Sequence, residues 1–462
     1  MDIQTINPAT GQLLQSYPTL SQSEVTTSIQ QGHEAFLQWR ELPITQRSEL
    51  MLRAADLLVT DNEHYATLIS TEMGKPITYA RSEVSKCAKV CHYFATSAAE
   101  FIKPRHITTE LDSSYITYQP LGVIFAIMPW NFPFWQVFRF AAPNLMAGNA
   151  ALLKHAPIVT GCGLAIETLF RQAGFPKYLF QTLIINEDQA SQVIADPLVA
   201  GVTLTGSERA GKSVASQAGT HIKKAVLELG GSDPYIILED ADLNNAALQC
   251  VKSRLANSGQ VCIAAKRFIA VKSIKTQFQN RVMIELNRYQ MGNPLDEQVD
   301  LGPLAREDLR LTVHQQVQQS VAQGAVLLQG GELPEDTPGF YYPVTVLDQV
   351  KKGMPAYDEE IFGPVITLIE AEDEGDAIRI ANDNRYGLAA AVFTKDIARG
   401  EKIAREQLTA GTCYVNQMVN SDPRLPFGGV KASGFGRELA EIGMHEFMNI
   451  KTVGVSDEGV KS

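Results

Sequence analysis

The stretch Gly122-Val123-Ile124-Phe125-Ala126-Ile127-Met128 is a continuous apolar run of strand length, and a helical pattern follows it. The run from Ala150 to Lys154 has the same character. The alternation of strand and helix continues through residues 180–185, 201–205 and 224–229. Strands that are apolar along their whole length are typical of parallel sheets with helices on both faces. The sequence therefore predicts an α/β fold built on a parallel sheet.

The segments on either side of these strands complete the predicted organisation. Roughly the first hundred residues have helical patterns, and residues 114–118 alternate like a half-buried strand. A second αβ series starts near Tyr235 and runs past Pro426, which predicts a domain boundary close to Gly230-Gly231. The final segment, residues 449–455, has the alternation of a further strand.

The composition is that of an acidic globular protein. The chain has 462 residues, of which 45% are hydrophobic, and its net charge of -11 argues against a nucleic-acid-binding surface. No apolar run of about eighteen residues predicts a membrane span, and no opening segment has the pattern of a secretion signal. The six cysteines have neither disulfide-scaffold nor zinc-site spacing. We therefore expect a cytoplasmic enzyme that needs no metal.

Two motifs supply a candidate nucleophile and a candidate base. Cys262 ends the motif Asn257-Ser258-Gly259-Gln260-Val261-Cys262, thirty-four residues after Glu228 in Glu228-Leu229-Gly230-Gly231. A thiol with a lowered pKa is a nucleophile, and a nearby carboxylate activates the water that releases the captured group. Each residue alone also has an ordinary structural explanation, since most cysteines are small buried hydrophobes. Together they favour acyl-transfer chemistry.

These motifs, their spacing and their flanking segments resemble the aldehyde dehydrogenase superfamily, in the same order from about Ile6-Asn7-Pro8 to Arg437-Glu438. The resemblance implies an α/β, aldehyde dehydrogenase-like fold in three parts. These are a Rossmann-type dinucleotide-binding domain (residues 1–103 and 121–231), an α/β catalytic domain (232–430) and a small β oligomerisation element (104–120 and 445–457). It also implies a homodimer or homotetramer that oxidises a small-molecule aldehyde.

The resemblance implies a role for each catalytic residue. The thiolate of Cys262 attacks the aldehyde carbon, and Glu228 activates the water that hydrolyses the resulting thioester. Asn131, in Pro129-Trp130-Asn131-Phe132-Pro133, is the expected oxyanion-hole donor together with the Cys262 backbone amide. Relatives that transfer the acyl group to coenzyme A lack a Glu at the position of Glu228, so its presence favours hydrolysis.

The cofactor residues are likewise implied by the resemblance, and NAD and NADP are both expected. Relatives that prefer NAD carry a Glu three residues after Lys154, where this chain has Pro157, so no carboxylate repels a 2′-phosphate there. Ser207, at a helix N-terminus, is expected to bind the pyrophosphate. The implied cofactor-binding residues are Trp130, Lys154, Gly206, Ser207, Gly211, Leu229, Glu360 and Phe362.

One motif also supports a function of another class. Residues Gly206 to Ser213 satisfy the P-loop pattern between an apolar strand and a helical pattern, which is the context that motif requires. The apolar run from Tyr235 to Asp240 ends in acidic residues, as a magnesium-holding strand does. A P-loop nucleoside triphosphatase is therefore the alternative, although it leaves the motifs of Glu228 and Cys262 without a purpose.

The substrate is predicted from a small number of positions. Arg139 lies among aromatic residues, where it either pairs with an Asp or Glu or binds a substrate carboxylate. Succinate semialdehyde dehydrogenases carry an Arg at this offset and a Ser at the position of Ser421, but they also carry an Arg where this chain has Ala256. Succinate semialdehyde is the expected substrate, and a broad specificity for small aldehydes is the alternative.

Overall fold

The computed structural model describes residues 2–335 and 337–456, and the predicted apolar runs form one parallel sheet in it. Its strand order is β19-β9-β8-β5-β6-β7, and only the edge strand β19 is antiparallel. From β5 the chain adds β6 and β7 on one side of the sheet and then β8 and β9 on the other. The order of the strands therefore switches between β5 and β8, and α/β sheets bind ligands at such a switch point. The strands are β5 (Val123–Met128), β6 (Ala150–His155), β7 (Phe180–Thr182), β8 (Val199–Thr205), β9 (Lys224–Glu228) and β19 (Gly434–Phe435).

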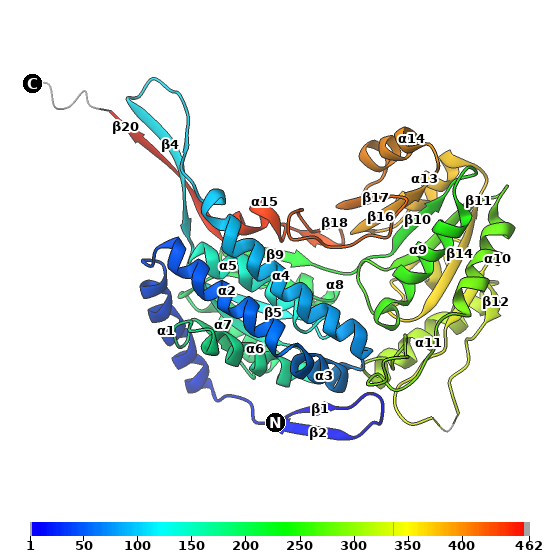
Figure 1. Cartoon of the computed structure of the whole chain (residues 1–462), viewed down its shortest axis with the longest axis horizontal. Coiled ribbons are helices and arrows are strands. Elements are labelled where there is room, and N and C mark those ends of the chain that lie inside the picture. Colours follow the sequence, from blue (N-terminus) through cyan, green and yellow to red (C-terminus); the bar gives the residue numbers. More distant parts are fainter. Residues whose placement is uncertain (1, 336, 457–462) are drawn as a thin grey trace, which may run out of the picture.

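Helices cover both faces of this first sheet. On one face α5 (Trp135–Ala147) and α6 (Thr160–Gln172) pack on the strands, and α2 (Ile44–Thr60), α3 (Asn62–Met73) and α4 (Ile77–Phe101) cover them in turn. The other face carries α1 (Gln22–Trp39), α7 (Glu187–Ala195) and α8 (Glu208–Thr220) (Figure 1). In the described part of the chain, no helix is long and apolar enough to cross a membrane.

The N-terminus differs from the helical prediction for the first hundred residues. β1 (Ile3–Ile6) and β2 (Leu13–Tyr17) form an antiparallel hairpin before α1. Both strands are short and mostly exposed, so they lack the apolar alternation that identifies a strand in the sequence. Gly11, with φ of 72°, supplies the left-handed residue of the turn.

A second sheet begins immediately after Gly230-Gly231. Its order is β12-β13-β14-β11-β10-β16-β17, and β12 alone is antiparallel. Helix α9 packs against α10 on one face, and α13 packs on the other. The strands are β10 (Asp233–Ile237), β11 (Ala265–Val271), β12 (Val326–Gln329), β13 (Thr345–Asp348), β14 (Val365–Ala371), β16 (Ala389–Phe393) and β17 (Thr412–Val415). The main helices are α9 (Leu243–Leu255), α10 (Lys275–Leu286), α11 (Glu307–Ala322) and α13 (Glu374–Asn382).

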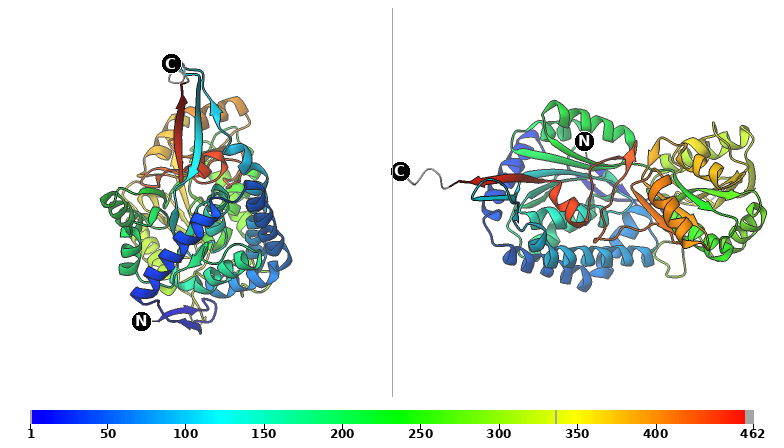
Figure 2. Two further views of the ribbon diagram at one scale, coloured as in Figure 1. Left: turned by 90° about the vertical axis from the view of Figure 1, so that its left-hand side faces the viewer. Right: turned by 90° about the horizontal axis from the view of Figure 1, so that it is seen from above.

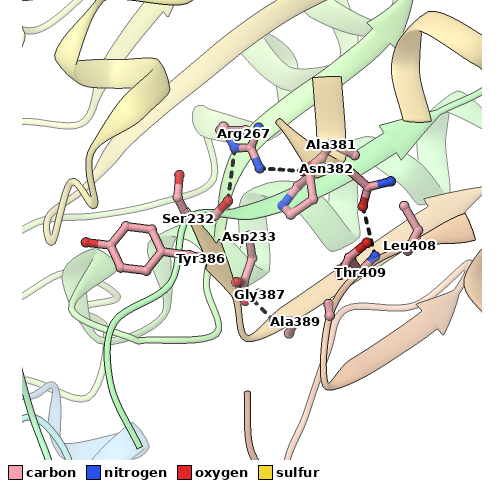
Figure 3. A pocket seen from close by; sticks show the side chains of 13 residues that line it. Ser232, Asp233, Arg267, Ala381, Asn382, Tyr386, Gly387, Ala389, Leu408 and Thr409 are labelled. Carbon is pink, nitrogen blue, oxygen red and sulfur yellow. Dashed lines mark hydrogen bonds between the residues drawn. The ribbon is translucent and has the colours of Figure 1, made fainter. Parts of the chain in front are cut away.

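A buried cation ties the layers of the second sheet together. Arg267 on β11 donates hydrogen bonds to the backbone oxygens of Ser232 and Ala381 at 2.9 Å each (Figure 3). Asp233 accepts a hydrogen bond from the Ala389 amide at 3.1 Å beside it. The cavity among these residues is about 10 Å³, which is room for about one water molecule, so it is no ligand site.

The remaining elements are short. They are η1 (Pro157–Val159), η2 (Ala256–Gly259), α12 (Pro355–Asp358), β15 (Tyr386–Gly387), α14 (Ile397–Lys402), η3 (Ile403–Gln407), β18 (Val430–Lys431) and α15 (Ala440–His445). The segment after β18 returns to the first sheet, because β19 pairs with β9.

A three-stranded arm projects from the body of the molecule, as both Figure 1 and Figure 2 show. It consists of β3 (Arg105–His106), β4 (Ser113–Pro120) and β20 (Met448–Val455), with β4 paired antiparallel to both neighbours. These strands fall in the two segments predicted to form the oligomerisation element. Met1 and residue 457, at the outer ends of the predicted ranges, lie outside the described residues. The division into three functional parts stays a prediction.

Candidate active site

A strained turn places Cys262 in the space between the two sheets. Asn257, Ser258 and Gly259 have φ of 51°, 55° and 78°, a run of left-handed residues that is unfavourable for side chains other than glycine. Ser258 Oγ donates to the Gly302 backbone oxygen at 2.8 Å. A Cβ on Gly259 would lie 2.1 Å from the Gly363 oxygen, so this turn is pressed against the loop that follows Phe362.

Cys262 lies where two cavities meet. A cavity of about 130 Å³ and another of about 240 Å³ both contact Cys262 and Gln136. The smaller is lined by predicted substrate residues, Arg139 and Ser421, and we call it the aldehyde pocket. The larger is lined by Trp130, Asn131, Gly206, Ser207, Leu229, Glu360 and Phe362, and we call it the nucleotide pocket. A thiol at this junction can meet one ligand from each side.

Asn131 is hydrogen-bonded to the loop that carries the thiol. Its Nδ2 donates to the Gln260 backbone oxygen at 3.0 Å, while Asn257 Nδ2 donates to the Asn131 backbone oxygen at 2.9 Å. An amide nitrogen has two hydrogens, so Asn131 has a second one for a substrate oxygen. This location suits the predicted oxyanion role, which stays a prediction.

The charge on Cys262 is set by opposing effects. Burial raises the pKa of its thiol to about 11, while the nearby cations Lys266 and Arg139 act to lower it. Lys266 Nζ donates to the backbone oxygens of Val261, at 3.0 Å, and of Cys262. The same ammonium forms an ion pair with Glu360 at 3.1 Å. Lys266 therefore joins the loop that ends in Cys262, which we call the nucleophile loop after its predicted role, to the nucleotide pocket.

Glu228 is not brought into either cavity. Its backbone oxygen, at the end of β9, accepts from the Gly206 amide at 3.0 Å, but its side chain turns toward Gly428. Within residues 2–335 and 337–456, neither carboxylate oxygen has a hydrogen-bond partner. Burial and the neighbouring Glu438 raise the pKa of Glu228 well above its usual range. The carboxyl must rotate to reach a water beside Cys262, and its role as base stays a prediction.

Arg139 has the acidic partner required by one of its two sequence-based alternatives. It pairs with the buried carboxylate of Glu438, and its guanidinium lies 4.5 Å over the Phe427 ring. Its Nη2 also donates to Thr205 Oγ1 at 3.3 Å. The side chain lines the aldehyde pocket, yet its charge is already matched by a carboxylate.

The nucleotide pocket combines an open helix end with flat aromatic walls. Ser207 caps α8, with its Oγ accepting from the Ala210 amide at 3.3 Å. Trp130 and Phe362 meet edge to face with ring centres 5.7 Å apart. A Cβ at Gly230 would lie 2.2 Å from a carboxylate oxygen of Glu360, so the Gly230 backbone lies directly against that side chain. Such a helix end suits a pyrophosphate, and these residues fit a dinucleotide.

Two predicted cofactor residues lie outside this pocket. Gly211 on α8 packs against Leu229, because a Cβ there would lie 2.6 Å from the Leu229 side chain. Lys154, near the end of β6, is half-buried, and burial lowers its pKa while Glu187 opposes that shift. An open hollow of about 770 Å³ adjoins the pocket, since Ser207 and Glu360 line both. No cluster of metal-ligating side chains occurs among the described residues.

The P-loop alternative is wrong. Helix α8 begins at Glu208, so only Gly206 and Ser207 of the octapeptide precede the helix, and no loop is left to surround a triphosphate. Lys212, which would have to reach the phosphates, is 76% exposed and pairs with Glu208. The part of the octapeptide that follows Ser207 is the beginning of helix α8.

The sequence alone did not identify Lys86, Gln136, Lys266 or Glu438. Lys86 and Gln136 lie inside helical patterns in which nothing distinguishes them from other polar positions. Glu438 lies at the end of the region that resembles the family, where no pattern in the sequence marks it as a partner of Arg139, yet its carboxylate pairs with that residue.

The model of the aldehyde dehydrogenase family matches residues 1–453. The chain belongs to this family. It is 48% identical over 99% of its length, and over all of the relative, to a probable succinate-semialdehyde dehydrogenase of the NADP(+) type from Synechocystis sp.. It is 46% identical, over 97% of both chains, to the Escherichia coli succinate semialdehyde dehydrogenase Sad, of the NAD(P)+ type.

A solved structure extends the comparison to three dimensions. The succinic semialdehyde dehydrogenase of Streptococcus pyogenes, solved with NADP+, matches with a TM-score of 0.96 and 36% identity. The match covers 98% of this chain and all of the other. The expected aldehyde dehydrogenase fold is therefore confirmed.

Proposed function

We propose that this aldehyde dehydrogenase oxidises succinate semialdehyde to succinate with either NAD+ or NADP+. The observation that carries the proposal is the place of Cys262 between the nucleotide pocket and an aldehyde pocket that contains cationic and hydroxyl groups. An aldehyde with a carboxylate at its far end complements that pocket. The printed names of the relatives support the same substrate and cofactors.

The cofactor proposal rests on the shape and charge of the nucleotide pocket. Ser207 and the start of α8 would hold the pyrophosphate, Glu360 the nicotinamide ribose, and Lys154 the adenosine ribose. Pro157 begins η1 and has no carboxylate to repel a 2′-phosphate, so NADP+ is accepted as well as NAD+. When bound, the nicotinamide ring accepts a hydride from the aldehyde carbon.

The side chains of the chain perform the remaining chemistry. The Cys262 thiolate adds to the aldehyde carbon, and the new oxyanion accepts a hydrogen bond from Asn131. The acyl group is left on Cys262 as a thioester. Glu228, rotated from its place beside Gly428, takes a proton from the water that hydrolyses this thioester. Succinate leaves and the free thiol is restored.

Steady-state kinetics on the wild-type enzyme test this proposal. Succinate semialdehyde and butanal have the same chain length and differ in the terminal carboxylate. We expect kcat/KM to be at least about tenfold higher for the semialdehyde with both NAD+ and NADP+, as hydrogen bonds to a charged group allow. Equal or better use of butanal would favour the broad-specificity alternative. No reduction of either nucleotide with any aldehyde would refute dehydrogenase activity itself.

We also propose a homo-oligomer, a dimer or tetramer, assembled through the arm of β3, β4 and β20. The arm leaves Ile450 58% exposed and Leu111 47% exposed, and a projecting sheet with apolar side chains suits pairing with another copy. Sedimentation equilibrium is expected to give two or four times the chain mass of 50.6 kDa. A single-chain mass at micromolar concentration would contradict this proposal.

The location of the protein is a separate point. All six cysteines are free, which fits the cytoplasm.

A further inference from the structure

Lys86 is a cation in the aldehyde pocket that the known motifs do not include. It lies on α4, and its side chain lines the same cavity as Cys262. Its Nζ donates to Ser421 Oγ at 2.6 Å and to Asn420 Oδ1 at 3.2 Å. The ammonium lies 4.2 Å from the centre of the Trp135 ring.

The two cations of the pocket differ in how their charge is matched. Arg139 pairs with the buried Glu438. Lys86 contacts only a hydroxyl, an amide oxygen and an aromatic face, and among the described residues no carboxylate lies within ion-pair distance of it. Burial, and then the neighbouring Arg139, lower the pKa of Lys86 to about 8. The positive charge of a half-buried cation with neutral partners is not balanced by a nearby negative charge, and an anionic ligand supplies one.

Lys86 and Ser421 each have a hydrogen-bond donor left for that ligand. An ammonium has three N–H groups, and Lys86 uses two of them on Ser421 and Asn420. The Ser421 hydroxyl accepts from Lys86, so its own hydrogen is left to donate. Together they offer one N–H and one O–H, which match the two oxygens of a carboxylate.

We propose that Lys86, with Ser421, binds the distal carboxylate of the substrate and is the principal specificity-determining cation of the aldehyde pocket. This inference rests on the proposed succinate semialdehyde activity. Ala256 lines the same cavity without any charge, so the nucleophile loop supplies no cation there. Lys86 supplies it from α4 instead. Arg139, held by Glu438, contributes a positive field and packing rather than the main ion pair.

The test compares Lys86→Met, Lys86→Arg and Lys89→Met with the wild type. Lys89 lies one turn further along α4 and is exposed, so it is a matched control for loss of a lysine. For Lys86→Met we expect kcat/KM on succinate semialdehyde to fall about 10- to 100-fold, mainly through KM, because the carboxylate is remote from the reacting carbon. Butanal should change less than about threefold. Lys86→Arg should retain most of the preference, and Lys89→Met all of it.

The pH dependence supplies a second test that needs no loss of the side chain. The ratio of kcat/KM for succinate semialdehyde to that for butanal cancels the titration of Cys262 and Glu228, which act on both substrates. Because the Lys86 ammonium loses its proton as pH rises through about 8, the ratio should fall above that pH in the wild type and stay level in Lys86→Arg.

The other charged or titratable groups near Lys86 do not produce this fall. Arg139 is paired with the Glu438 carboxylate. The pKa of Cys87 is raised well above its usual range by burial, and Asp422, paired with Arg424, has its pKa lowered to about 2. The remaining neighbour, Glu83, forms a buried ion pair with Lys75.

The outcomes separate the two proposals. If the wild type does not prefer the semialdehyde, the proposed substrate fails, whatever Lys86 does. If the wild type prefers it and Lys86→Met keeps that preference, or the ratio is level across pH 8 in the wild type, the inference about Lys86 is overturned and Arg139 binds the carboxylate. If Lys86→Met does not fold, the Lys86→Arg variant and the pH ratio decide the question.

Discussion

Replacement of Cys262 by Ala is expected to lower kcat for aldehyde oxidation at least about 1,000-fold with every aldehyde and with both nucleotides. The thiol is the only nucleophile proposed at the junction of the nucleotide and aldehyde pockets, and without it no thioester forms. The reduced nucleotide is followed by its absorbance. Thermal unfolding should show that the variant is folded, because alanine leaves the Asn257–Gly259 turn intact.

Cys413→Ala is the matched control for this prediction. Cys413 is a partly exposed thiol on β17 that lines neither pocket, so its loss should change kcat less than about twofold. Because burial raises the pKa of Cys262 to about 11, alkylation of the free enzyme by iodoacetamide should accelerate as pH rises toward that value. Substantial residual turnover in Cys262→Ala would place the nucleophile elsewhere.

Replacement of Glu228 by Gln should lower the steady-state kcat by about 100- to 10,000-fold but should leave the rate of the first turnover unchanged. The thiol can still be acylated, but the amide cannot take a proton from the hydrolytic water. A burst of reduced nucleotide equivalent to one turnover per subunit should therefore appear, followed by a slow phase. Mass spectrometry of the quenched enzyme should find an acyl group on Cys262.

The pH profile follows from the environment of the same carboxyl. Burial, and then Glu438, raise the pKa of Glu228, so the base form predominates only above that raised value. The kcat of the wild type should rise with pH through this titration, and Glu228→Gln should lose that limb. Glu441→Gln, at an exposed position near Glu438, is the control and should behave like the wild type. Full turnover without a burst in Glu228→Gln would show that another group activates the water.

The central strands of the first sheet were predictable because they are buried on both sides. Val123–Met128 needs apolar side chains at every position, and that pattern is visible without any knowledge of its partners. The motif of Cys262 was equally visible, since glycine and small polar residues mark a turn. The hairpin of β1 and β2 was not, because exposed strands carry no apolar signal.

The electrostatics of the site depend on contacts between distant segments. Glu438 meets Arg139 only because β19 returns to β9, which is a pairing of two-residue length. Lys86 reaches the aldehyde pocket from a helix otherwise engaged with α2 and α5. The orientation of Glu228 follows from the space beside Gly428. None of these relations leaves a periodic signal in the sequence, so Glu228 and Arg139 could be predicted as site residues while their partners and charge states could not.

The contact between Gly259 and Gly363 makes two loops into one mechanical unit. One loop ends in Cys262, and the other contains Glu360 and Phe362 of the nucleotide pocket. Backbone in direct contact with backbone has no side chain that can yield, so a displacement of either loop moves the other. A displacement of the loop at Phe362 would therefore also shift the turn that positions Cys262.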